Sequence, residues 1–217
     1  FYVMVTWKPF FMEVACRLER GPRRHLTFFE LKEQLELGVG CPVCSLRDGA
    51  VDRYMDTLLY EQINDAVVRA RIAAARGFCK HHAWHLRLKG DPLGQAIIYH
   101  DLVSNMIDQL EGLPGSWTRR SARGPMRFLS SKKRSPWAVD RCPICVYAEN
   151  SELRFITSLL YYLRSDEEMR NVYDRSAGLC FPHFLLAIEH SDPGLARYLV
   201  AKELAVLRSL AANLERL

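Results

Sequence analysis

The chain has 217 residues, of which 49% are hydrophobic and 25% are charged, a composition that excludes wholesale disorder and allows one large or two small cores. Its net charge of +5 is unevenly spread, because residues 114–141 carry +7 and the rest of the chain carries −2. No run of about 18 apolar residues occurs, so we expect no membrane-spanning helix and no membrane partner. The apolar opening segment lacks the basic leader and cleavage site of a signal peptide, and we expect a cytoplasmic protein.

The first 40 residues are predicted to form an N-terminal extension with one helix. Thr27 and Glu30 have the spacing of a capping box, in which the two side chains satisfy free backbone N–H groups at a helix start. Cys16, in the same extension, lacks a counterpart elsewhere in the chain. We expect it to be a free thiol.

An internal repeat with an offset of 101 residues organises the remainder of the chain. "CPVC" at 41–44 matches "CPIC" at 142–145, and "GFCKHH" at 77–82 matches "GLCFPH" at 178–183. No gap is needed between the first motif and the end of either copy. The repeat divides the chain into an extension (1–40), copy one (41–113), a basic linker (114–141) and copy two (142–217).

Both copies are predicted to be helical, which makes the fold class all-α. Apolar residues fall three and four apart in "VDRYMDTLLYEQI" and "LRFITSLLYYLR", as one buried helical face requires. Asn64 and Ser165 occupy equivalent positions and are favourable N-cap residues, and Ser165 with Glu168 has capping-box spacing. Gly77 and Gly178 suit the left-handed conformation that often ends a helix.

Each copy contains the four donor residues that one tetrahedral zinc site requires, as C-x2-C, then 34 residues, then C-x2-H. Thiolate and imidazole are the ligands that structural zinc sites use, and four donors leave no open position. We therefore predict two structural zinc ions, one held by Cys41, Cys44, Cys79 and His82, the other by Cys142, Cys145, Cys180 and His183. His82 is preferred as a ligand because it recurs as His183, whereas His81, the alternative, is replaced by Pro182.

This ligand assignment has a consequence for the shape of each copy. Thirty-four residues in one straight helix would span about 50 Å, while four ligands of one ion must lie close together. Each copy is therefore predicted to be a helical hairpin that its metal closes at the open end, with Asn64 or Ser165 at the tip. Long helices are predicted to follow each C-x2-H.

Three other uses of these cysteines remain open. Disulfides would use six of them but would leave both histidines without a role, and nothing in the sequence indicates export. An iron–sulfur cluster with three cysteines and one histidine is an alternative cofactor. A catalytic metal centre is also possible in copy one, where His81 and His85 could act as acid–base groups.

The motifs resemble those of a bacterial family of unknown function that pairs CPxC with GFCxxH around a helical hairpin, often in duplicate. The resemblance rests on the CPxC motifs at 41–44 and 142–145, and on "GFCKHH" and "GLCFPH", with the intervening "YEQINDAVVR" and "SDEEMR". It covers residues 41–217 and implies metal binding and a helical fold, without an activity.

Two segments are candidates for binding a partner. The basic linker interleaves eight Arg and Lys with Trp117, Phe128 and Trp137, a composition that suits non-specific nucleic-acid binding. In the C-terminal helix, the spacing of Leu207, Leu210, Leu214 and Leu217 is that of a coiled-coil seam. We expect this stripe to be buried in the chain's own core, with a protein partner or a homodimer as the alternative.

The sequence thus favours a non-enzymatic, zinc-stabilised helical module that binds a macromolecule. The alternative is a metal-dependent or iron–sulfur redox enzyme centred on copy one.

Overall fold

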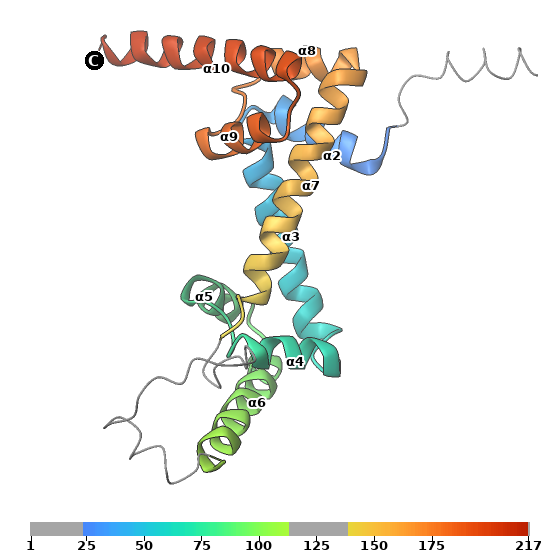
Figure 1. Cartoon of the computed structure of the whole chain (residues 1–217), viewed down its shortest axis with the longest axis vertical. Coiled ribbons are helices and arrows are strands. Elements are labelled where there is room, and N and C mark those ends of the chain that lie inside the picture. The colour runs from blue at the N-terminus through green and yellow to red at the C-terminus, as the bar shows by residue number, and fades with distance from the viewer. Residues whose placement is uncertain (1–23, 113–138, 217) are drawn as a thin grey trace, which may run out of the picture. The chain divides into compact units, whose positions relative to one another are not determined.

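The computed structural model describes residues 24–112 and 139–216, in which the helices are joined by short loops and no strand occurs (Figure 1). The prediction of an all-α fold is confirmed. Three predictions fall wholly or largely outside the described residues: the free thiol of Cys16, the basic linker except for 139–141, and Leu217 in the C-terminal stripe. Nothing in the described part of the chain is both long and apolar enough to serve as a transmembrane helix.

The described residues form two compact units that interleave the two sequence copies. The terminal unit contains residues 24–49 and 150–216, and the central unit contains residues 50–112 and 139–149. The helices, in chain order, are α2 (Leu26–Leu37), α3 (Pro42–Tyr60), α4 (Ala66–Ala74), α5 (Lys80–Leu88), α6 (Pro92–Glu111), α7 (Pro143–Ser165), α8 (Glu167–Arg175), α9 (Phe181–Glu189) and α10 (Pro193–Leu214). Helices α3 and α7 each contribute residues to both units, so neither unit corresponds to one copy of the repeat.

The terminal unit has a core of aromatic and aliphatic side chains from its helices. Helix α2 contacts α8, and α9 contacts α10. The rings of Phe28 and Tyr162 meet edge to face, with centroids 5.0 Å apart, a favourable arrangement for buried aromatic pairs. Other fully buried members of this core are Leu31, Phe155, Ile156, Leu159, Leu163 and Met169.

The central unit has a separate core, in which α6 contacts α4 and α5. Its buried members include Met55, Leu58, Leu59, Ile72, Leu86, Ile98, Leu102 and Ile144. Tyr54 and Tyr147 stack at its margin, with ring centroids 4.2 Å apart. Apolar residues spaced three and four apart predicted one buried helical face in each copy. The face of copy one fills the central core, and the face of copy two fills the terminal core.

The predicted break in each 34-residue segment is confirmed, but the capping residue is one position later than expected. Asp65 caps α4 by accepting hydrogen bonds from the backbone N–H of Val67 and Val68 at 2.7 and 3.0 Å. Asp166 caps α8 through the N–H of Met169. A carboxylate is favoured at this position because the N-terminal end of a helix carries partial positive charge.

The predicted capping boxes are wrong. Ser165 lies in the last turn of α7 and donates to the carbonyl of Tyr161, and Glu168 pairs instead with Arg24 and Lys32. Helix α2 begins at Leu26 and its N-cap, His25, makes no capping hydrogen bond, so Thr27 lies inside the helix. The spacing of a serine or threonine three residues before an acidic residue does not fix the residue at which a helix begins. The side chain of Glu168 forms ion pairs with Arg24 and Lys32 and so does not bond to the backbone at the helix start.

Gly77 and Gly178 adopt the predicted left-handed conformation, with φ of 98° and 78°. The N–H of Gly77 reaches back to the carbonyl of Ile72 at 2.8 Å. A Cβ at this position would also lie 3.1 Å from Leu102. These two glycines turn the chain immediately before each C-x2-H motif, which fixes where the cysteine and histidine are presented.

The expectation that the C-terminal leucine stripe is buried is wrong for its described members. Leu207, Leu210 and Leu214 are 44%, 53% and 60% exposed. Helix α10 is buried only along its first half, through Leu195, Leu199 and Glu203. Its second half therefore presents apolar side chains that the described residues do not cover.

Candidate metal centres

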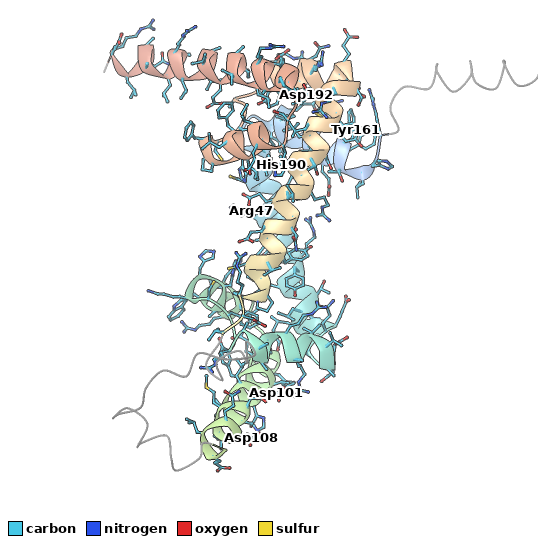
Figure 2. All side chains as sticks on the ribbon, in the orientation of Figure 1. Arg47, Asp101, Asp108, Tyr161, His190 and Asp192 are labelled. Carbon is cyan, nitrogen blue, oxygen red and sulfur yellow. The ribbon has the colours of Figure 1, made fainter. Side chains whose placement is uncertain are left out.

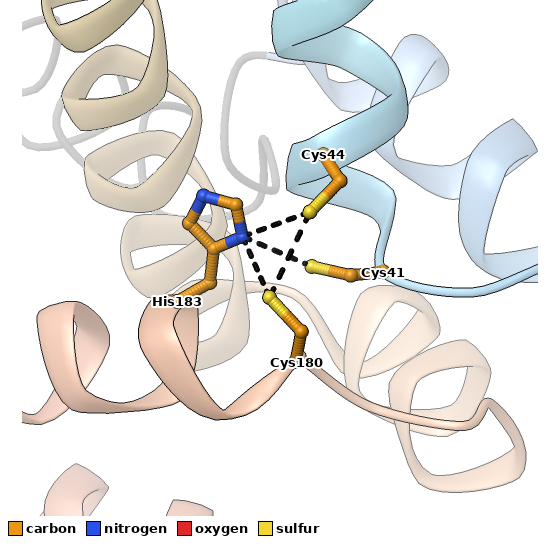
Figure 3. A group of neighbouring side chains, drawn as sticks. All are labelled: Cys41, Cys44, Cys180 and His183. Atoms are coloured by element: carbon orange, nitrogen blue, oxygen red, sulfur yellow. Dashed lines mark hydrogen bonds between the residues drawn. The ribbon is translucent and has the colours of Figure 1, made fainter.

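Four donor side chains converge in the terminal unit: Cys41, Cys44, Cys180 and His183 (Figure 3). Nδ1 of His183 lies 3.3 Å from the Sγ atoms of Cys41 and Cys44 and 3.0 Å from that of Cys180. The Sγ atoms of Cys44 and Cys180 are 3.7 Å apart. We call this group the terminal centre.

The central unit contains a second group of the same composition: Cys79, His82, Cys142 and Cys145. Nδ1 of His82 lies 3.2 Å from the Sγ of Cys79, 3.7 Å from that of Cys142 and 3.3 Å from that of Cys145. The Sγ atoms of Cys79 and Cys145 are 3.6 Å apart. We call this group the central centre.

Both groups fit one tetrahedral metal ion. With metal–sulfur bonds of about 2.3 Å and metal–nitrogen bonds of about 2.0 Å, tetrahedral geometry places sulfurs about 3.8 Å apart and sulfur and nitrogen about 3.5 Å apart. The sulfur–sulfur separations of 3.6 and 3.7 Å are close to these values. All six cysteines are free thiols, so no disulfide competes for them. Each group could therefore hold a metal ion.

The eight residues singled out in the sequence all lie in these groups, but the predicted pairing is wrong. Each centre takes its CPxC cysteines from one copy and its C-x2-H from the other. The helical hairpin closed by its own metal is therefore also wrong. The two copies have identical spacing. The sequence alone therefore does not indicate whether a CPxC motif shares its metal with the C-x2-H motif of its own copy or with that of the other copy.

Each centre is built from the N-terminal ends of two helices. In the terminal unit, Cys41 directly precedes α3 and Cys180 is the N-cap of α9. In the central unit, Cys142 directly precedes α7 and Cys79 is the N-cap of α5. The partial positive charge at a helix N-terminus stabilises a thiolate, which is the form of cysteine that binds a metal.

The thiols differ in how readily they lose their protons. Burial, reinforced by neighbouring thiols, raises the pKa of Cys44 and that of Cys145 to about 12. Burial also raises the pKa of Cys41. At Cys79 burial acts in the same direction, but hydrogen bonds from the backbone N–H of His82 and from nearby thiols outweigh it and lower the pKa. A cation that binds at neutral pH must therefore displace protons.

Two other histidines of copy one, His81 and His85, lie on α5 beside His82. His85 is half-buried, and its Nε2 lies 3.3 Å from a carboxylate oxygen of Asp52. His81 is exposed, and its ring centroid is 5.0 Å from that of His82. His82, and not His81, is the histidine whose Nδ1 faces the thiols.

Glu152 is a residue that the sequence did not indicate. Its Oε1 contacts Nε2 of His183, on the side of the ring away from the thiols. The repeat places Val51 at the equivalent position of copy one, so comparing the copies gave no signal for a carboxylate here.

The fold and these two groups define an all-α protein with two three-cysteine, one-histidine groups that could hold metal ions. The chain belongs to a family of unknown function, DUF6062, whose model matches residues 23–217. A relative in Caldicellulosiruptor sp. (strain Rt8B.4), described as an uncharacterised 23.9 kDa protein in the xynA 3′ region, is 26% identical over 151 residues. The match covers 69% of this chain and 66% of the relative, so the chain spans just under two thirds of that protein's length. No solved structure matches the chain.

Proposed function

We propose that the protein is a non-catalytic helical module in which each centre holds one structural zinc ion. The observation that carries this proposal is the complete set of four donors in each centre, three thiols and one imidazole at tetrahedral separations. Catalytic zinc sites use three protein ligands and keep a position for water or substrate. A centre whose four positions are filled by protein stabilises a fold.

Donor spacing supports a single ion over an iron–sulfur cluster. All donor atoms of each group lie within 4.8 Å of one another. In a cluster the protein ligands are divided among two or more iron atoms, and the core of iron and sulfide between them requires more room than one ion. Zinc suits three thiolates and one imidazole and prefers the tetrahedral geometry that these donors form.

The structural role follows from which segments each ion would join. In the terminal centre the ion would link the start of α3 to the start of α9, two elements separated by more than 130 residues of sequence. Such a link closes a long loop of chain, and metal binding energy of this kind contributes directly to folding. Each unit has a modest core and gains stability from such a crosslink.

Metal analysis of protein purified without chelator tests this proposal. We expect about two zinc ions per chain and a colourless protein. Removal of the ions by a strong chelator is expected to lower helical content, measured by circular dichroism, and zinc but not magnesium is expected to restore it. Brown protein containing iron and acid-labile sulfide would contradict the proposal, as would less than one metal equivalent.

The exposed half of α10 favours self-association as a second function. Leu207, Leu210 and Leu214 form a stripe with coiled-coil spacing that the described residues leave uncovered. We propose that the stripe pairs with the same stripe of a second copy. Light scattering coupled to size exclusion is expected to give a dimer mass, which the double variant Leu207→Gln, Leu214→Gln reduces to that of a monomer. Ser209→Gln, on an exposed position of the same helix, is the matched control.

Nucleic-acid binding by residues 114–141 is a further proposal that rests on sequence alone. Its basic charge predicts binding that weakens with salt, with a slope of log K against log salt of up to about −0.9 per phosphate contacted. Changing Arg119, Arg120, Lys132, Lys133 and Arg134 to Gln should flatten this slope while both metals stay bound. Absence of retention on nucleic acid at low salt would leave the linker as a tether.

A further inference from the structure

The two centres have the same donors, but they differ in what holds the histidine. In the terminal centre Nδ1 of His183 faces the three thiols, and Nε2 on the opposite side of the ring contacts Glu152. His183 is only 2% exposed. Its ring is thus fixed at both nitrogens. When Nδ1 binds a metal, Nε2 carries the proton, and Glu152 accepts it in a hydrogen bond.

Glu152 is itself held in place. It lies on α7, seven residues after Cys145, and its side chain is largely shielded from solvent, with 23% exposed. Nη1 of Arg47 lies 3.5 Å from Oε1 of Glu152, and the same guanidinium bonds Asp48 at 2.8 Å. Arg47 is on α3, immediately after the ligands Cys41 and Cys44 (Figure 2). Its positive charge offsets the carboxylate that Glu152 brings beside a thiolate-rich centre.

The central centre lacks this arrangement. Among residues 24–112 and 139–216, no carboxylate contacts His82, whose ring neighbours are the three thiols and His81. The offset of 101 residues places Val51 where Glu152 stands, and Val51 is buried in the central core. It also places Ala148 where Arg47 stands. The next residue, Asp52, is engaged by His85 and Lys89.

We propose that Glu152 is a positioning residue for His183, and that the terminal centre therefore holds its metal ion more tightly than the central centre does. A carboxylate that accepts the second N–H of a ligating histidine fixes the ring and makes the other nitrogen a stronger donor. Loss of such a partner costs about 10–100-fold in metal affinity. The terminal ion is then a permanent part of the fold, and the central ion is the one that exchanges first. This inference rests on the proposed zinc binding.

The test follows zinc release from the full-length, zinc-loaded protein into an excess of a chromogenic chelator. We expect two phases of equal amplitude, with the slower phase from the terminal centre. Cys180→Ser, which retains only the central ion, should show the fast phase alone, and Cys79→Ser should show the slow phase alone. Glu152→Gln should accelerate the slow phase by about 10–100-fold and leave the fast phase unchanged.

Two further measurements separate positioning from general destabilisation. Glu168→Gln removes a carboxylate of the same unit that bonds Arg24 and Lys32 but no ligand, and it should change neither phase. With Co²⁺ in the Cys79→Ser protein, Glu152→Gln should shift the visible absorption bands of the terminal ion, while Glu168→Gln should not. These bands report the ligand field of the metal and do not follow the stability of the surrounding helices.

The outcomes distinguish this inference from the function on which it rests. Two bound ions that leave in one phase, or a terminal ion that leaves first, would overturn the inference and leave the proposed zinc module intact. Unchanged release and unchanged Co²⁺ spectra in Glu152→Gln would do the same. Protein that binds no zinc would overturn both.

Discussion

The terminal and central centres contain the same set of ligands in two different environments. Both place three thiols and one imidazole at the N-terminal ends of two helices, and both draw one half of the set from each sequence copy. They differ around the histidine, because His183 contacts Glu152 while His82 has His81 beside it and no carboxylate among the described residues. The two centres thus share their donors but differ in the residues that contact those donors, so equal ligands need not give equal metal affinity.

The largest expected effect tests the pairing of the ligands. Cys44→Ser with Cys180→Ser damages one centre twice, so this double variant should keep about one ion per chain. Cys44→Ser with Cys79→Ser damages both centres, and we expect loss of both ions and of most helical structure, since structural zinc contributes about 10 kcal/mol or more to folding. Metal content measured by atomic emission decides the matter. The reverse result would restore the pairing within each copy.

A pH titration of metal affinity compares the thiols of the two centres. The pKa of Cys44 is raised to about 12 and that of Cys41 is also raised, so the metal-free terminal centre retains these protons at neutral pH and releases them on binding. Affinity should therefore rise with pH, by up to about tenfold per pH unit for each proton released. The lowered pKa of Cys79 means that its proton is already lost at lower pH, which makes the slope of the central centre shallower.

Competition with a chelator of known affinity, over about pH 6 to 9, gives both slopes if the centres are studied separately. Cys79→Ser reports the terminal centre, and Cys180→Ser reports the central centre. Affinities that do not change with pH would show that the thiols are already ionised before metal binds.

Truncation of equivalent core leucines compares the two units as folding units. Leu58 in the central core and Leu159 in the terminal core are equivalent in the repeat, and both are buried. Replacing either by alanine should lower the free energy of unfolding by about 2–5 kcal/mol, because a cavity is left behind. Hydrogen exchange should show Leu58→Ala weakening mainly the central unit and Leu159→Ala mainly the terminal unit. Uniform loss of protection would instead indicate that the units unfold together.

The smallest expected effect compares the two helix caps. Asp65 caps α4 at an exposed position, and Asp65→Ala should cost about 1 kcal/mol. Asp166 caps α8, is buried, and also pairs with Arg24, whose guanidinium lies 2.9 Å away. Asp166→Ala should cost more, about 2–3 kcal/mol, since it also removes a partly buried ion pair. Urea unfolding of the zinc-loaded protein measures both, and equal costs would show that the Arg24 contact contributes nothing.

Features that depend on short stretches of chain could be predicted from the sequence. Apolar residues spaced three and four apart predicted helices, and the equivalent positions of Gly77 and Gly178 predicted left-handed turns before each C-x2-H motif. The exact offset of 101 residues indicated which eight side chains gather in two groups of the same composition. These features are local, or are repeated, and therefore leave a direct record in the order of residues.

The tertiary structure alone decided how those pieces combine. Equal spacing made Cys79 and Cys180 interchangeable as partners of Cys44, and only the tertiary packing within the terminal unit, which contains both Cys44 and Cys180, selected Cys180. The ion pairs of Glu168 drew it away from a capping box, and the contact of Glu152 with His183 joins residues whose types carry no shared motif. Contacts between distant segments depend on which faces are buried together, and a pattern confined to one segment does not contain that information.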